Sequence, residues 1–157
     1  MNFVIDNPNF HMKNVSLAES KKNIVLEGYF TKLNYLSKWC TMSSLLFYLP
    51  IEPKHILNEN NNIGIKFDAY SSNNLNVVKF FSQMEQQILD YYIQYQQRTF
   101  KKCNLLNKQL FNGFIKINSS SKHFERSKKL IIKISGIWET KTEIGITYKI
   151  FDANKMN

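Results

Sequence analysis

Lysine residues dominate one stretch of the chain, and their spacing is the first feature that points to chemistry. Between Arg98 and Lys133 there are ten basic residues and one acidic residue, Glu125, whereas the rest of the 157-residue chain is balanced in charge. The whole net charge of +9 therefore lies in this stretch. Lysines gathered on phosphates gain affinity by releasing condensed counterions, so the stretch predicts a polyanionic partner. A basic surface that only keeps the protein soluble is the alternative.

Aromatic residues stand beside several lysines in segments that alternate like β-strands. Single-stranded nucleic acids bind grooves that combine positive charge with rings, because every base has a flat face on which a ring can stack. Phe114 shares a face with Lys116 if its strand is regular, which makes it a candidate for stacking. Trp138 and Tyr148 share a face with isoleucines, so stacking and core packing both remain open for them. Core positions are expected for Phe30, Phe47, Phe67, Phe80 and Phe81.

The candidate nucleic-acid contacts combine such rings with the lysines near them. Tyr35 and Trp39 flank Lys38 at a junction between two predicted strands. Only two of the 21 basic residues are arginine, the residue on which base reading in a duplex groove depends, so binding without sequence preference is expected. The predicted binding residues are Tyr35, Lys38, Trp39, Lys101, Lys102, Lys108, Phe114, Lys116, Lys128, Lys129, Lys133, Trp138, Tyr148 and Lys149.

Residue patterns typical of catalysis or metal binding do not occur in the sequence. The three histidines lie far apart without further ligands at motif spacing, and the two cysteines, Cys40 and Cys103, form no CxxC pair. Glu139 and Glu143 flank a turn, where pairing with Lys141 or water is the simpler explanation than a catalytic dyad. No Walker loop, GxGxxG or GxSxG motif is present. We therefore expect a protein that is not an enzyme, uses no cofactor or metal, and works in a reducing compartment.

Hydrophobic periodicity predicts six strands and one helix. The strands are expected at residues 22–35, 39–49, 63–68, 109–117, 129–139 and 143–151, with a loop at 53–62. From about residue 71 to Arg98, apolar residues recur every three or four positions, which predicts a helix whose buried stripe holds Val77, Phe81, Met84, Ile88, Tyr91 or Tyr92, and Tyr95. Residues 1–20 are expected to form a frayed arm or a short edge strand, 21–153 a single domain and 154–157 a short tail.

Short twisted strands with one helix late in the middle predict a mainly β fold. A small Greek-key barrel of the OB kind is the favoured architecture, and a helix-backed antiparallel sheet is the alternative. Gly28, Gly113, Gly136 and Gly145 interrupt predicted strands, where glycine usually marks a bulge or a sharp bend. No run approaches the roughly 18 apolar residues that cross a bilayer, and the start lacks the features of a signal peptide. These observations predict a cytoplasmic protein without a membrane partner.

The last two predicted strands carry the most specific pattern in the chain. Leu130-Ile131-Ile132-Lys133-Ile134-Ser135-Gly136-Ile137-Trp138-Glu139, a short polar turn and Glu143-Ile144-Gly145-Ile146-Thr147-Tyr148-Lys149 follow one another. This hairpin resembles the C-terminal hairpin of single-stranded DNA-binding proteins of large eukaryotic DNA viruses and AT-rich cytoplasmic linear plasmids. The strand at residues 63–67, followed by an amphipathic helix, has a similar order. The resemblance implies an OB-like replication protein that coats displaced strands at a cytoplasmic replication site.

The sequence thus leads to one functional hypothesis and two alternatives. The hypothesis is a single-stranded DNA-binding protein that acts in replication without sequence preference, with replication proteins or further copies of itself as additional partners. One alternative is a small viral structural or assembly protein whose basic surface contacts nucleic acid. The other is an RNA-binding accessory factor, which shares the same sequence features.

Overall fold

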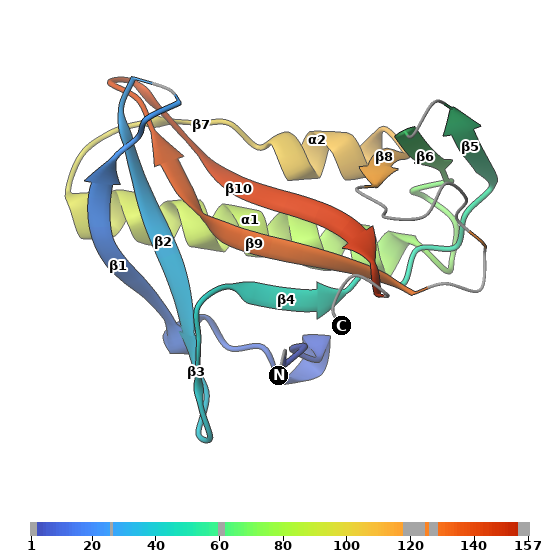
Figure 1. Cartoon of the computed structure of the whole chain (residues 1–157), viewed down its shortest axis with the longest axis horizontal. Helices are drawn as coiled ribbons and strands as arrows, with labels where there is room; N and C mark the ends of the chain where they lie inside the picture. The colour runs from blue at the N-terminus through green and yellow to red at the C-terminus, as the bar shows by residue number, and fades with distance from the viewer. Residues whose placement is uncertain (1–2, 26, 60–61, 118–124, 126–128, 154–157) are drawn as a thin grey trace.

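A long helix and a strongly curved sheet dominate the computed structural model (Figure 1). It describes residues 3–25, 27–59, 62–117, 125 and 129–153. Along its central path the main sheet has the order β1 (Val15–Lys22), β2 (Tyr29–Leu36), β9 (Leu130–Glu139), β10 (Glu143–Asp152) and β7 (Lys101–Lys102). Neighbouring strands on this path are antiparallel, except that β7 runs parallel to β10.

Two short strands and the N-terminal segment complete this sheet. β3 (Thr41–Met42) pairs with β2, and β4 (Leu45–Tyr48) pairs with β9. Two 3₁₀ turns, η1 (Asn7–Asn9) and η2 (Met12–Asn14), lead into β1. Ile5 is buried and bridges Phe47 of β4, and β1 pairs with β2 as an edge strand. Of the two expectations for the first twenty residues, the edge strand therefore describes the structure.

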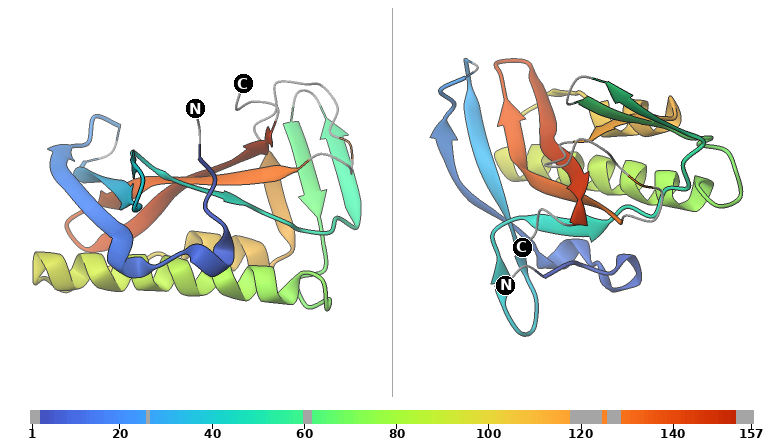
Figure 2. Two further views of the ribbon diagram at one scale, coloured as in Figure 1. Left: turned by 90° about the horizontal axis from the view of Figure 1, so that it is seen from below. Right: turned by 45° about the vertical axis from the view of Figure 1, so that its right-hand side comes forward.

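The main sheet curls into a half-barrel over α1 (Leu75–Gln96). Figure 2 shows the sheet crossing one side of this helix, with a second sheet beside the N-terminal end of the helix. That sheet contains β5 (His55–Glu59), β6 (Asn62–Lys66) and β8 (Phe114–Ile117). A second helix, α2 (Leu105–Phe111), packs on α1 and β8. The fold is mainly β with one long helix, as predicted, and its half-barrel is consistent with an OB-like barrel.

One face of α1 packs into the core on the concave side of the main sheet. The predicted helix is confirmed, but its buried stripe is rotated slightly. Val78 is buried where Val77 is expected, Tyr92 is the buried member of the tyrosine pair, and Tyr95 is exposed because the last turn extends beyond the core. The buried residues of α1 are Val78, Phe81, Met84, Glu85, Ile88, Leu89 and Tyr92.

Several strand boundaries differ from the prediction because chain turns interrupt long alternating runs. Only the second half of the predicted strand at 22–35 is a strand, β2: Lys22 is the last residue of β1, and the chain then turns, with the Asn23 N–H donating to the Gly28 carbonyl at 2.9 Å. Residues 39–49 form β3 and β4 with different partners, since the chain leaves β2 at Ser43 and joins β9 at Leu45. Alternation alone does not reveal such breaks, because both arms of a hairpin have the same period.

Two further segments have a different structure from the predicted one. The expected loop at 53–62 contains β5, which pairs with β6 through five residues. The expected strand at 109–117 begins as the last turn of α2 and becomes a strand only after Gly113, whose φ of 71° favours glycine. The predictions at 63–68, 129–139 and 143–151 are confirmed as β6, β9 and β10.

A β-bulge at Ser135 changes which face the end of β9 presents. Thr147 of β10 pairs with Gly136, but the next residue, Tyr148, pairs with Ile134, so Ser135 is the extra residue. Regular alternation predicts Trp138 on the isoleucine face. That prediction is wrong, because the bulge shifts Trp138 to the opposite face.

Candidate nucleic-acid interface

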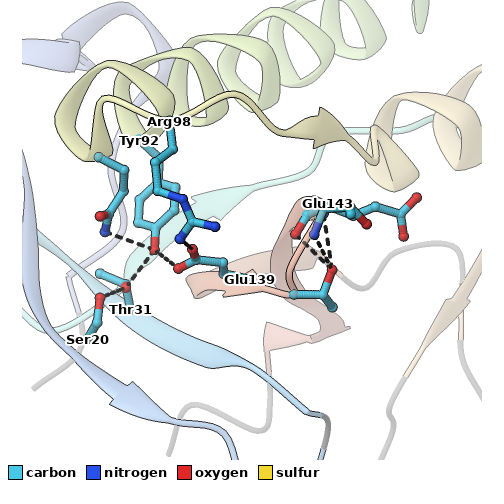
Figure 3. Close-up of polar contacts among 9 residues, drawn as sticks. Ser20, Thr31, Tyr92, Arg98, Glu139 and Glu143 are labelled. Carbon is cyan, nitrogen blue, oxygen red and sulfur yellow. Dashed lines mark hydrogen bonds and ion pairs between the residues drawn. The ribbon is translucent and has the colours of Figure 1, made fainter.

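A polar network at the C-terminal end of α1 shows which side chains of the main sheet face the helix and which point outward (Figure 3). The Tyr92 hydroxyl of α1 donates to Glu139 Oε2 at 2.8 Å and lies 3.3 Å from the Thr31 hydroxyl. Arg98 Nη1 donates to Glu139 Oε1 at 3.1 Å. Thr31 of β2 and Glu139 of β9 therefore face the helix. Side chains alternate along a strand, so the residues before them, Phe30 and Trp138, point to the outer, convex face.

The same network holds the strand ends in place electrostatically. Burial, opposed by the hydrogen bond with Thr31 and reinforced by Glu139, raises the pKa of Tyr92. The hydroxyl therefore stays protonated and donates a hydrogen bond to the Glu139 carboxylate. Because hydrogen bonds join both β2 and β9 to α1 here, the backbone that carries the rings of Phe30 and Trp138 is held in place.

Two aromatic rings of the outer face lie on glycines of the neighbouring strand. A Cβ atom at Gly145 would lie 2.5 Å from Cζ2 and 2.8 Å from Nε1 of Trp138, so the indole covers this glycine. A Cβ atom at Gly136 would lie 2.5 Å from Cζ of Phe30. Glycine at these positions lets each ring rest on the backbone of the adjacent strand. Both rings remain partly exposed, so each presents its outward surface to solvent.

Three lysines share the outer face with these rings. Lys133 of β9 and Lys149 of β10 are directly opposite partners, and Lys32 of β2 pairs with Gly136. Like charges at directly opposed positions are unfavourable unless an anion lies between them. No ion pair of Lys32, Lys133 or Lys149 occurs within the part of the chain that the structure describes. Uncharged neighbours of Lys133 and Lys149 on this face are Leu46, which pairs with Lys133, and Thr147 and Phe151 of β10.

We call Phe30, Lys32, Lys133, Trp138 and Lys149 the basic–aromatic face. Three of its members, Lys133, Trp138 and Lys149, are predicted from the sequence. Phe30 and Lys32 are not, and the expectation that Phe30 belongs to the core is wrong, since its ring lies on the outer side of the sheet. Each ring covers a glycine on the neighbouring strand. The sequence contains these glycines, but which aromatic residue lies across from which glycine can be read only when the strand register is known.

The second sheet carries a smaller cluster in which an aromatic ring also covers a glycine between lysines. The ring of Phe114 covers Gly64, where an added Cβ would lie 2.8 Å from Cε2 and Cζ of the ring. Lys116 pairs with Gly64 and Lys66 pairs with Phe114, so both lysines flank the ring on one face. The prediction that Phe114 and Lys116 share a face is confirmed.

Trp39 and Lys38 lie at the tip of the β2–β3 hairpin, which projects from the body of the protein (Figure 1). Trp39 is 86% exposed, and the Lys38 ammonium lies 5.2 Å from the centroid of its ring. The Ser37 hydroxyl accepts the Cys40 N–H at 3.0 Å and braces the turn. This pair is accessible to a ligand but separate from the basic–aromatic face.

Two rings among the predicted binding residues face the interior of the fold: Tyr35 is buried and Tyr148 is partly buried. Tyr35 is 3% exposed, its ring stacks on Phe10 with centroids 5.7 Å apart, and its hydroxyl accepts the His11 N–H at 3.1 Å. The N-terminal segment therefore covers it and leaves no ring face for a base. Tyr148 pairs with Ile134 on the inner face, and its hydroxyl is hydrogen-bonded to Gln109. Burial, with a contribution from the Glu85 carboxylate, raises the pKa of Tyr148 to about 12.

The basic stretch does not form one continuous surface. Lys101 and Lys102 pair with Glu143 at 3.7 Å and with Asp90 at 2.6 Å, so part of their charge is already balanced. Arg98 is bound to Glu139. Lys108 lies on α2. Lys129 directly precedes β9, and its ammonium lies 5.2 Å from the ring centroid of Tyr48. Lys128 lies outside the described residues.

Two other titratable groups, Glu85 and Cys103, have raised pKa values that contacts within the fold explain. Glu85 is fully buried and accepts the N–H groups of Leu106 at 3.0 Å and Asn107 at 2.9 Å at the start of α2, while burial raises its pKa. Burial and the nearby Glu143 raise the pKa of the Cys103 thiol, which disfavours the nucleophilic thiolate. Over the described ranges, no cluster of three or more His, Cys, Asp or Glu residues is placed to hold a metal ion.

Comparisons with known proteins give no relative from which the role of this interface could be inferred. No family model, curated protein or solved structure matches this chain. Among the helices that the structure describes, none has the length and apolar character needed to cross a membrane.

Proposed function

We propose that this protein binds single-stranded DNA without sequence preference and coats displaced strands during DNA replication. The observation that carries the proposal is the basic–aromatic face, on which two rings resting on glycines lie beside three lysines that form no ion pair with any residue described in the structure. Stacking platforms combined with positive charge are the general means by which proteins hold unpaired strands.

The geometry of the face suits two neighbouring bases and their phosphates. Phe30 and Trp138 are directly paired across β2 and β9, which places their Cα atoms about 5 Å apart. Two bases can therefore stack on adjacent rings, each contact contributing about 1–3 kcal/mol. Lys133 and Lys149 lie along the same two central strands and can neutralise the backbone that connects the bases.

Binding without sequence preference follows from the residue types on the face. Its cations are lysines, which act as point charges for phosphates, and it contains no arginine for bidentate recognition of a base edge. Stacking tolerates every base. The role in replication rests on the resemblance of the β9–β10 hairpin to viral and plasmid single-stranded DNA-binding proteins, and it requires no catalytic step.

A binding titration at two salt concentrations tests the proposal. The purified protein is titrated into mixed-sequence single-stranded DNA, duplex DNA and single-stranded RNA. We expect the single-stranded DNA to bind most tightly, and the logarithm of the binding constant to fall against the logarithm of salt with a slope of about −2 if three lysines neutralise phosphates. The sequence of the strand should have little effect.

Other results would support the alternatives. Tighter binding of duplex DNA, or a strong sequence motif, contradicts the proposal. Tighter binding of RNA than of DNA would indicate the RNA-binding accessory factor. Weak binding of all three polymers with a flat salt dependence would instead indicate a structural or assembly protein.

A further inference from the structure

The turn between β1 and β2 exposes two adjacent apolar side chains. Ile24 is 100% exposed and Val25 is 88% exposed. Single apolar residues are common on protein surfaces, but two adjacent β-branched residues with this much exposure in a hairpin turn favour a contact with another molecule. They have no part in the core or in the basic–aromatic face.

Hydrogen bonds and a close backbone contact hold the base of this turn. The Asn23 N–H donates to the Gly28 carbonyl at 2.9 Å, and the Val25 N–H donates to Asn23 Oδ1 at 3.1 Å. Gly28 has a φ of 148°, and a Cβ atom there would overlap the carbonyl oxygen of Glu139. The base of the turn thus lies directly on the end of β9, next to Trp138 of the basic–aromatic face.

Charged side chains, three basic and two acidic, line a cleft at the base of the turn. This cleft of about 250 Å³ lies between this turn and the β9–β10 turn, which are neighbours in Figure 1. Its basic residues are Lys22, Arg98 and Lys141, and its acidic residues are Glu27 and Glu139. Tyr29 also lines it, and Glu139 is already bound by Tyr92 and Arg98. On the outer side, Lys21 pairs with Phe30, so positive charge continues from the basic–aromatic face to the tip.

We propose that Ile24 and Val25 form an apolar wedge that contacts the first base pair where single-stranded DNA meets a duplex. A strand stacked on Phe30 and Trp138 leaves the sheet at this end, where the tip meets the paired region. Apolar side chains that insert at base steps unstack them, and the surrounding lysines neutralise the phosphates of both strands. This inference rests on the proposed binding of single-stranded DNA.

The test compares a forked DNA with a single strand of the same unpaired length and with a blunt duplex. We expect the wild-type protein to bind the fork more tightly than the single strand by about tenfold. The double variant Ile24→Ser/Val25→Ser should bind the fork and the single strand equally, with single-strand affinity unchanged. Leu105→Ser, at an exposed leucine on α2, is the matched control and should keep the fork preference.

The outcomes separate this inference from the proposed function. Tight single-strand binding with no fork preference, or a fork preference that survives the double variant, overturns the wedge and leaves the proposed function intact. Absence of single-strand binding overturns both. Binding to vesicles of anionic lipid that is lost in the double variant, without a fork preference, would assign the tip to a membrane surface and overturn the wedge.

Discussion

The opposed lysines Lys133 and Lys149 give an unusual prediction, because removing them should weaken binding without weakening the fold. They are direct cross-strand partners on the outer face, and Leu46, which pairs with Lys133 on its other side, is uncharged. A like-charge pair in this position is unfavourable by roughly 0.2–1 kcal/mol. Replacing either lysine with glutamine should therefore leave the free energy of unfolding unchanged or raise it by up to about 1 kcal/mol.

The double variant should gain little more than either single variant, because one substitution already removes the repulsion. Binding should behave differently. If each lysine neutralises one phosphate, each substitution lowers the salt slope by about 0.7, and the double variant lowers it by about 1.4. The effect on binding should thus be additive while the effect on stability is not.

Denaturant unfolding at low ionic strength measures the first effect, and titration of a labelled oligonucleotide at several salt concentrations measures the second. Lys79→Gln, at an exposed position of α1, is the control and should change neither quantity. If the lysine variants lose more than about 1 kcal/mol of stability while single-strand affinity and salt slope stay the same, the assignment of the binding face is refuted.

Three further predictions follow from the placement of individual side chains. Trp138→Ala should lose about 1–3 kcal/mol of single-strand binding, whereas Phe81→Ala should lose about 3–5 kcal/mol of folding stability, as paired titrations and melting curves will show. Replacing Lys101 and Lys102 with glutamine should lower affinity less than replacing Lys133 and Lys149, since both lysines have carboxylate partners; an equal or larger loss would contradict this. The pKa of Tyr148 is raised from 10.0 to about 12, so its contribution to stability is present below pH 10 and is lost as pH rises towards 12; Tyr148→Phe should remove this part of the alkaline destabilisation in unfolding measurements.

The parts of the fold that the sequence predicts are those with long, uninterrupted periodicity. α1 and the β9–β10 hairpin agree with the expected ranges within a few residues. Predictions fail where the chain turns inside an alternating run, as at Asn23 to Gly28, because the pattern of polar and apolar residues does not record a change of direction. The bulge at Ser135 is equally invisible in the pattern, and it alone decides the side on which Trp138 lies.

The candidate site is only partly predictable because it is assembled by strand pairing. Residues 98–133 are close in sequence, yet the lysines among them that the structure describes lie on separate elements, including α2, β7 and both sheets. Lys32 and Phe30 come from a neutral part of the chain and join the site only because β2 pairs with β9. Tyr35 is removed from it by the N-terminal segment, whose packing no local pattern indicates.

The fluorescence of Trp138 provides the most direct test that the basic–aromatic face holds single-stranded DNA. The chain has two tryptophans, so Trp39→Phe leaves Trp138 as the only indole, and Trp138→Phe leaves Trp39. Adding single-stranded DNA to the first variant should quench the Trp138 emission saturably, because a stacked base lies on the ring, and duplex DNA should quench it much less. If Trp138 emission stays constant at strand concentrations that saturate binding, the strand is held elsewhere and the proposed interface is wrong.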